Sequence, residues 1–153
     1  MSKQRKRAVV VVALGASVLC VVGAEGPSSD DVIAERQHTM ESIQAALKEV
    51  VSIVRKEASF DAEVVRGSGT KIAELLDQAS KLFPEGSEKG GIETWAKPEI
   101  WSRPEGFVEA LERTRDAAVS LAEVTEESKL GPALGQLGNG CKGCHDTYRR
   151  PKE

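Results

Sequence analysis

The residues with the most distinctive chemistry lie near the C-terminus, where Cys141, Cys144 and His145 form the pattern C-x-x-C-H. Two thiols three residues apart on a helix lie on one side of it, so both can add to the two vinyl groups of one porphyrin. The imidazole of the residue that follows can reach the iron. The pattern therefore predicts one covalently attached c-type haem, with His145 as the axial metal ligand.

Three other interpretations of the two cysteines compete with haem attachment. A zinc site needs a second pair of ligands, and His38 is the only other histidine in the sequence. A thioredoxin-like redox pair needs a βαβ context, for which the sequence gives no signal. A disulfide between Cys141 and Cys144 is the third, although closing such a short loop within a helix is strained.

The first 24 residues have the composition of a targeting segment. Four basic residues precede an uncharged run of 17 residues that ends at Ala24, and Val22 and Ala24 stand at the −3 and −1 positions of a cleavage site. We expect residues 1–24 to be a signal peptide and residues 25–153 to be the exported domain, located in the periplasm of a bacterium. An uncleaved N-terminal anchor is the alternative, because 17 apolar residues reach the lower limit for a membrane span.

Length, charge and composition limit the number of domains, the partners and the fold classes that the sequence allows. The chain of 153 residues is long enough for one domain. Without residues 1–24 it holds 17 basic and 24 acidic residues, a formal charge of −7. This balance excludes nucleic-acid binding through a basic surface and predicts a basic redox partner protein, attracted by electrostatic steering. Six aromatic residues are too few for an all-β sandwich or barrel.

Four amphipathic segments must position the cysteines. Apolar residues recur at spacings of three and four in residues 30–56, 61–83, 104–127 and 130–150. Such segments predict an all-α fold, an antiparallel up-down-up-down four-helix bundle, with the haem near the C-terminal helix. The expected core residues are Ile33, Met40, Ile43, Leu47, Val50 and Val54; Val65, Ile72, Leu75, Leu76, Ala79, Leu82 and Phe83; Phe107, Leu111, Thr114, Ala118, Leu121 and Val124; and Leu130, Leu134, Leu137, Cys141, Cys144 and Tyr148.

The connection between the second and third segments, residues 84–104, is unusually long. It contains three of the six prolines and both tryptophans, Trp95 and Trp101. Long connections in small domains are usually functional or wrapped on the surface. We expect the tryptophans to anchor this connection to the bundle.

Three parts of the sequence together resemble the cytochrome c′ family. The segment CKGCHDTYRR at 141–150 is similar to the family's C-x-x-C-H-x-x-Y-R ending, PEIW at 98–101 to a signature before the third helix, and ERQHTM at 35–40 to an Arg-Gln-x-x-Met/Leu pattern. The resemblance covers nearly all of the chain after residue 24. It implies a four-helix bundle with one covalent haem c, and often a homodimer formed through the first two helices.

The resemblance also implies roles for cofactor-binding residues. Arg36 and Gln37 match residues near a haem propionate, Glu93 and Thr94 match contacts to the haem edge, and Arg149 matches a basic residue on the proximal side. An arginine on a core stripe needs an anion, which agrees with the role of Arg36. Without haem, Arg36 would extend its charge to solvent from the bundle edge, and Arg149 would be a cation at a helix C-terminus.

Met40 matches the distal position of the family, and its role decides the function. As a sixth iron ligand it would raise the potential and favour electron transfer. As a side chain that only blocks the distal face, it would leave a five-coordinate iron for a diatomic gas, nitric oxide or carbon monoxide. Electron transfer is the first hypothesis, gas binding the alternative, and a haem-free structural helical protein a third. No nucleophile, acid–base pair or distal His–Arg pair indicates an enzyme.

Overall fold

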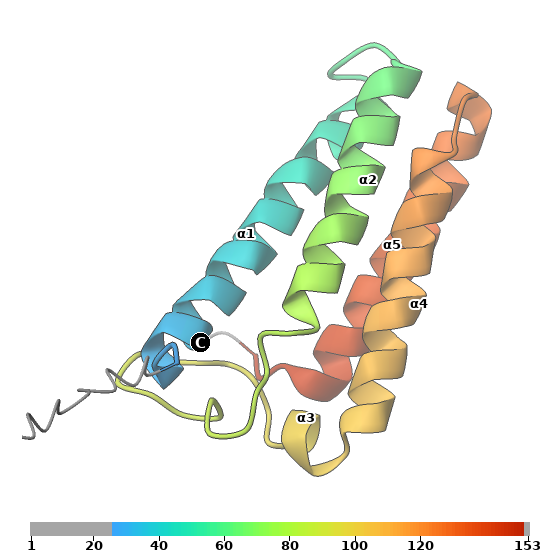
Figure 1. Cartoon of the computed structure of the whole chain (residues 1–153). Helices are drawn as coiled ribbons and strands as arrows, with labels where there is room; N and C mark the ends of the chain where they lie inside the picture. Colours follow the sequence, from blue (N-terminus) through green and yellow to red (C-terminus); the bar gives the residue numbers. More distant parts are fainter. Residues whose placement is uncertain (1–25, 152–153) are drawn as a thin grey trace, which may run out of the picture.

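The computed structural model describes residues 26–151, which form five helices and no strand of a sheet. The helices are α1 (Ser29–Val54), α2 (Ala62–Ala79), α3 (Glu99–Ser102), α4 (Pro104–Ala122) and α5 (Glu127–Tyr148). The four long helices run alternately up and down, and α3 is one short turn beneath them (Figure 1). The predicted all-α, antiparallel four-helix bundle is confirmed.

The expected signal peptide, residues 1–24, lies outside the described residues, and its cleavage stays a prediction. Within residues 26–151, each helix is either too short or too polar to cross a membrane.

Local sequence explains where the helices begin. Ser28 caps α1 in a capping box, in which its hydroxyl accepts from the backbone N–H of Asp31 and the Asp31 carboxylate accepts from the Ser28 backbone. Asp61 accepts from two backbone N–H groups at the start of α2. Pro104 occupies the first position of α4, where its missing N–H costs no hydrogen bond.

Three observed bounds differ from the sequence prediction by three or more residues. Helix α4 ends at Ala122 rather than at residue 127. Helix α2 ends at Ala79 rather than at residue 83, because Lys81 and Leu82 bond back three residues, to Gln78 and Ala79, and tighten the chain into a turn. Helix α5 begins at Glu127 rather than at residue 130 and includes Pro132. The predicted connection 84–104 contains α3, which the sequence prediction missed.

Helices that follow each other in the chain pack together, whereas α1 and α5 share few contacts. Glycine brings two of the pairs close. A Cβ at Gly69 would lie 2.6 Å from the backbone nitrogen of Ala122, and one at Gly140 would lie 3.0 Å from Oγ1 of Thr114. Helices α2 and α4, and helices α4 and α5, therefore pack closely against each other, whereas α1 and α5 do not.

Most expected core residues are buried. All six from the third segment are, along with Ile33, Ile43 and Val50 of α1. Val54 is the exception: it is 40% exposed because α1 ends there. On α5 only Leu130 and Leu137 are fully buried, whereas the other four predicted positions are partly buried against the same core, Leu134, Cys141, Cys144 and Tyr148.

Candidate functional site

The two cysteines lie on the inner side of the last turns of α5. Both are free thiols, partly buried and packed against the core. Burial raises the pKa of the Cys141 thiol. It raises that of Cys144 to about 11, with a further increase from Cys141 and an opposing effect of the Arg113 cation. Before haem is attached, both groups are therefore protonated thiols near neutral pH.

His145 follows on the same helix and keeps contact with solvent. Desolvation of part of its ring lowers the pKa of His145, the Arg149 guanidinium lowers it further, and Asp146 opposes both effects. A lowered pKa favours the neutral imidazole, which is the form that binds a metal.

Arg36, on α1, is 5% exposed and is held by groups of this chain. Its guanidinium donates to the carbonyl oxygen of Ser87 at 2.8 Å and to the Ser87 hydroxyl at 3.3 Å. It also lies over the rings of Phe83, at 4.8 Å, and Trp101, at 5.6 Å. Desolvation lowers the pKa of Arg36, and the nearby Glu88 carboxylate opposes that shift. The structure thus places a fixed cation at the base of the bundle.

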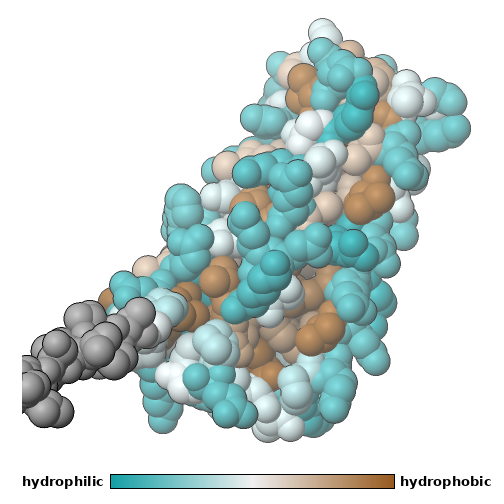
Figure 2. Space-filling view, in the orientation of Figure 1, coloured by the Kyte–Doolittle hydropathy of each residue, from teal (hydrophilic) through white to brown (hydrophobic). Residues whose placement is uncertain are grey.

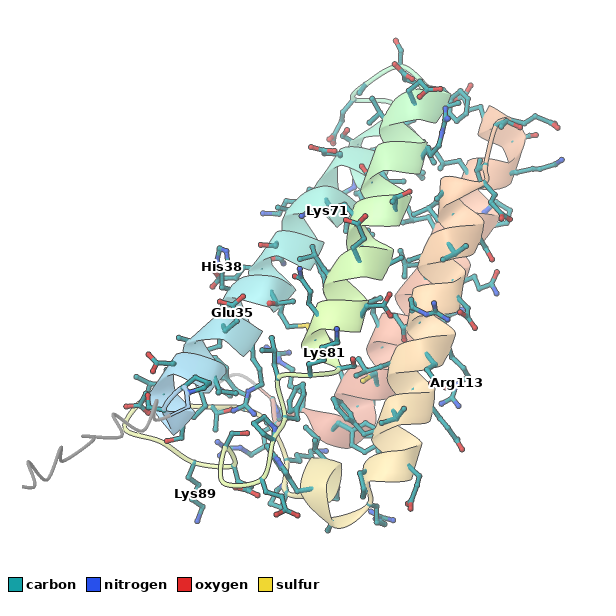
Figure 3. The ribbon with its side chains drawn as sticks, in the orientation of Figure 1. Glu35, His38, Lys71, Lys81, Lys89 and Arg113 are labelled. Carbon is teal, nitrogen blue, oxygen red and sulfur yellow. The ribbon has the colours of Figure 1, made fainter. Side chains whose placement is uncertain are left out.

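Gln37 and Met40 follow Arg36 on α1. The Gln37 side-chain amide donates to the backbone oxygen of Glu93 at 2.7 Å. Met40 is partly buried against the same core that the two cysteines contact. The side chains of Glu35 and His38, in contrast, project away from the bundle (Figure 3). The α1 residues that resemble family positions therefore point to the core or to the connection after α2.

Residues 83–98, which we call the strap, join α1 to the end of α5 beneath the bundle (Figure 1). On the α1 side, Asp30 Oδ1 accepts from the backbone N–H groups of Gly91, at 2.6 Å, and Ile92, at 3.3 Å. On the α5 side, the Lys97 N–H donates to the carbonyl oxygen of Tyr148 at 3.0 Å, and the Arg150 N–H donates to that of Trp95 at 2.7 Å. The strap thereby connects the two helices that share few contacts.

The strap also brings together residues that the sequence prediction had named separately. Glu93 is bonded to Gln37, and the carbonyl of Thr94 accepts from the Arg150 side chain. Sequence reasoning missed Ser87, which holds Arg36, and missed Lys97. The sequence offered no signal for either residue beyond the length of the connection and its aromatic and proline residues.

An aromatic cluster fixes the base of the site. The Phe83 ring lies 4.7 Å from Phe107 and 5.9 Å from Trp101, and Phe107 lies 5.2 Å from Tyr148. The indole N–H of Trp101 donates to the Pro84 carbonyl at 3.0 Å, within the connection. The Trp101 ring also packs against the core and beneath Arg36 of α1, so Trp101 anchors the connection to the bundle. Figure 2 shows apolar residues on the lower half of this face, and smaller apolar areas between hydrophilic residues on the upper half.

The residues present fit a covalent haem between α1 and α5. Two thiols face the core from α5, His145 is the next residue, and Met40 approaches the same core from α1. Their donor set, two thioether-forming thiols and an imidazole, is that of a c-type haem. A zinc site does not fit, because residues 26–151 contain no cluster of three or more histidine, cysteine or acidic side chains that could hold a metal ion.

Comparison with known proteins agrees with this site. The model of the cytochrome c′ family matches residues 31–149. Cytochrome c′ of Rhodopseudomonas palustris is 32% identical over 123 residues, covering 80% of this chain and 84% of the relative. Cytochrome c-554 of Cereibacter sphaeroides is 32% identical over 121 residues, covering 76% and 91%.

Among solved structures, the nitric oxide complex of a cytochrome c prime variant from Alcaligenes xylosoxidans is similar, with a TM-score of 0.73 and 26% identity over 83% of this chain and all of that one. The match to the family model spans both the α1 residues and the C-x-x-C-H pattern. The chain belongs to the cytochrome c′ family and carries that family's cofactor, a covalently attached haem c.

Proposed function

We propose that this haem protein transfers electrons, with Met40 as the sixth ligand of the iron. The proposal rests on the placement of Met40 on α1, where its thioether is partly buried against the core that Cys141 and Cys144 also contact. A thioether ligand from Met40, together with the His145 imidazole, would stabilise ferrous iron and raise the reduction potential.

The surroundings of the site support a redox role. The strap bonds to both α1 and α5, so it opposes a change in their separation when the charge of the site changes by one. Arg36 supplies a buried positive charge that its bonds to Ser87 hold in place. A propionate at this position would pair with it, and Gln37 would add a donor. Glu93 and Thr94, through the strap, are proposed to border the haem edge.

Replacement of the proposed ligand tests this function. In Met40→Leu, a side chain of similar size lacks the thioether, so we expect the midpoint potential to fall and the ferric spectrum to become high-spin. Leu47→Ala is the control, because Leu47 lies two turns further along α1, is also partly buried and offers no ligand atom. An unchanged potential and spectrum in Met40→Leu would show that Met40 does not bind the iron.

Binding of a diatomic gas is the second candidate, and a specific observation favours it. The similar structure from Alcaligenes xylosoxidans is a nitric oxide complex. In this alternative the iron is held by His145 alone, and Met40 restricts what can approach the other side. Uptake of carbon monoxide by the ferrous protein distinguishes the two functions.

The cellular setting follows from the same proposal. Attachment of haem to a C-x-x-C-H pattern and the basic, then apolar, residues 1–24 together support export to the periplasm. We propose that the protein acts there on a redox partner rather than as an enzyme. A homodimer through α1 and α2 is compatible with their outer faces, which carry charged residues.

A further inference from the structure

We propose that the end of α5 is the docking surface for an acidic face of a redox partner, an inference that rests on the proposed electron transfer. Four cations form this surface, which we call the α5 cationic surface: Lys97, Lys142, Arg149 and Arg150. Lys142 lies between the two cysteines and Arg149 is one turn beyond His145, so the cations surround the haem-bearing turn.

Hydrogen bonds and ion pairs place these four residues close to one another. The Lys97 ammonium donates to the Asp146 carbonyl at 3.0 Å, and Lys142 pairs with the Asp146 carboxylate. The Arg150 side chain donates to the Thr94 carbonyl. Arg149 is the C-cap residue of α5, four residues after His145. The strap thus adds a lysine to the cations that α5 itself supplies.

Among the described residues, two carboxylates lie at this surface. Asp146 belongs to it and Glu93 borders it through the strap, so within residues 26–151 four cations stand against two anions. Arg113, on α4, also acts on the Cys144 thiol but pairs with Glu109 at 3.7 Å and projects from the outer face of its helix (Figure 3).

Stabilisation of the helix end accounts for Lys97, whose ammonium bonds the Asp146 carbonyl, but not for Arg149. Cations near a helix C-terminus often compensate its free carbonyl groups. Here the Tyr148 carbonyl accepts from the Lys97 backbone, and the His145 carbonyl accepts from the Arg149 backbone. Within residues 26–151, no hydrogen bond or ion pair engages the Arg149 guanidinium, which is exposed. It is therefore free to meet a carboxylate of another protein.

The local charge and the net charge lead to opposite expectations. The formal charge of −7 after residue 24 predicts a basic partner at long range, whereas the α5 cationic surface predicts an acidic one at contact. Charges beyond a Debye length, about 10 Å at ~0.1 M salt, are largely screened. At that ionic strength, the charges nearest the site of electron exchange should decide whether the protein prefers an acidic or a basic partner.

Two charge reversals on one helix test this inference. Lys142→Glu changes the α5 cationic surface, and Lys129→Glu is the matched control. Both lysines are exposed on α5, by 73% and 67%, and each pairs with a carboxylate three or four residues away in the chain. Thirteen residues of helix separate them by about 20 Å, and both substitutions change the net charge equally.

The measurement is the rate at which each ferrous protein is oxidised by hexacyanoferrate(III), an anion, and by tris(phenanthroline)cobalt(III), a cation. At ~0.1 M salt, Lys142→Glu should slow the anionic reaction about fivefold and speed the cationic one, while Lys129→Glu changes either by less than about 1.5-fold. At ~1 M salt the differences should vanish.

Equal effects of the two substitutions, or no effect of Lys142→Glu, would overturn the docking surface and leave electron transfer intact. If neither complex oxidises the unaltered ferrous protein, the electron-transfer proposal and the docking surface both fall. The haem content of each variant is checked by its pyridine haemochrome spectrum.

Discussion

Single residues of this protein carry more than one structural role, and Arg36 is the clearest case. A sequence pattern could locate it on a core stripe, and its burial agrees with that position. Its partners could not be predicted, because Ser87, Phe83 and Trp101 are 47 or more positions away and reach it only through the strap. Three-residue spacing, in contrast, was enough to place Cys141 and Cys144 on the same side of α5.

Ser87 should matter more for stability than an exposed serine nearby. Its hydroxyl is buried, accepts from Arg36 and donates to the Pro84 carbonyl at 2.7 Å. Ser87→Ala should lower the free energy of unfolding by about 1–2 kcal/mol, since a buried donor and acceptor both lose a partner. Chemical denaturation measures this effect.

Ser80→Ala is the control for that substitution. The Ser80 hydroxyl also donates to a backbone carbonyl three residues earlier, but it is exposed and water can replace it. Its loss should cost less than about 0.5 kcal/mol. Equal destabilisation by the two substitutions would mean that the Arg36–Ser87 contact adds nothing to stability.

At the scale of elements, hydrophobic spacing predicted the four long helices but not where two helices approach each other closely. The apolar stripes of α2 and α4 show which faces are inward, and those faces are buried. The sequence alone treats Gly67 and Gly69 alike, as two residues that weaken a helix. Only the packing distinguishes them, because Gly69 meets the backbone of α4 and Gly67 meets open space.

The two glycines should respond oppositely to the same substitution. Gly69→Ala would place a Cβ 2.9 Å from the Ala118 carbonyl oxygen and should destabilise the protein by about 1–3 kcal/mol. Gly67→Ala should stabilise it by about 0.5–1 kcal/mol through helix propensity. Thermal unfolding of both variants checks the prediction. Stabilisation by Gly69→Ala would show that α2 and α4 do not approach each other closely.

At the scale of the whole molecule, the strap completes a bundle whose first and last helices share few contacts. Its length was evident from the sequence, but its bonds to both helices were not, because backbone carbonyls and N–H groups make most of them. Such contacts depend on the path of the chain rather than on residue type. This is why the fold could be predicted and the surroundings of the site only in part.

Loss of the hydrogen bonds between the strap and α1 should let the strap open locally more often. Asp30→Ala removes the acceptor for the Gly91 and Ile92 N–H groups, so their hydrogen exchange should become at least about tenfold faster, which corresponds to about 1.4 kcal/mol. Asp77→Ala is the control, because Asp77 pairs only with an exposed arginine, Arg115, at 3.7 Å. Unchanged exchange at Gly91 and Ile92 in Asp30→Ala would contradict the role of this contact.

The most direct test of the central claim is the optical spectrum of the purified protein, ferric and ferrous, before and after addition of carbon monoxide. Electron transfer with Met40 as the sixth ligand predicts low-spin spectra in both oxidation states and no change with the gas. A high-spin spectrum that shifts on addition of carbon monoxide would contradict it, and would identify the site as one that binds a diatomic gas.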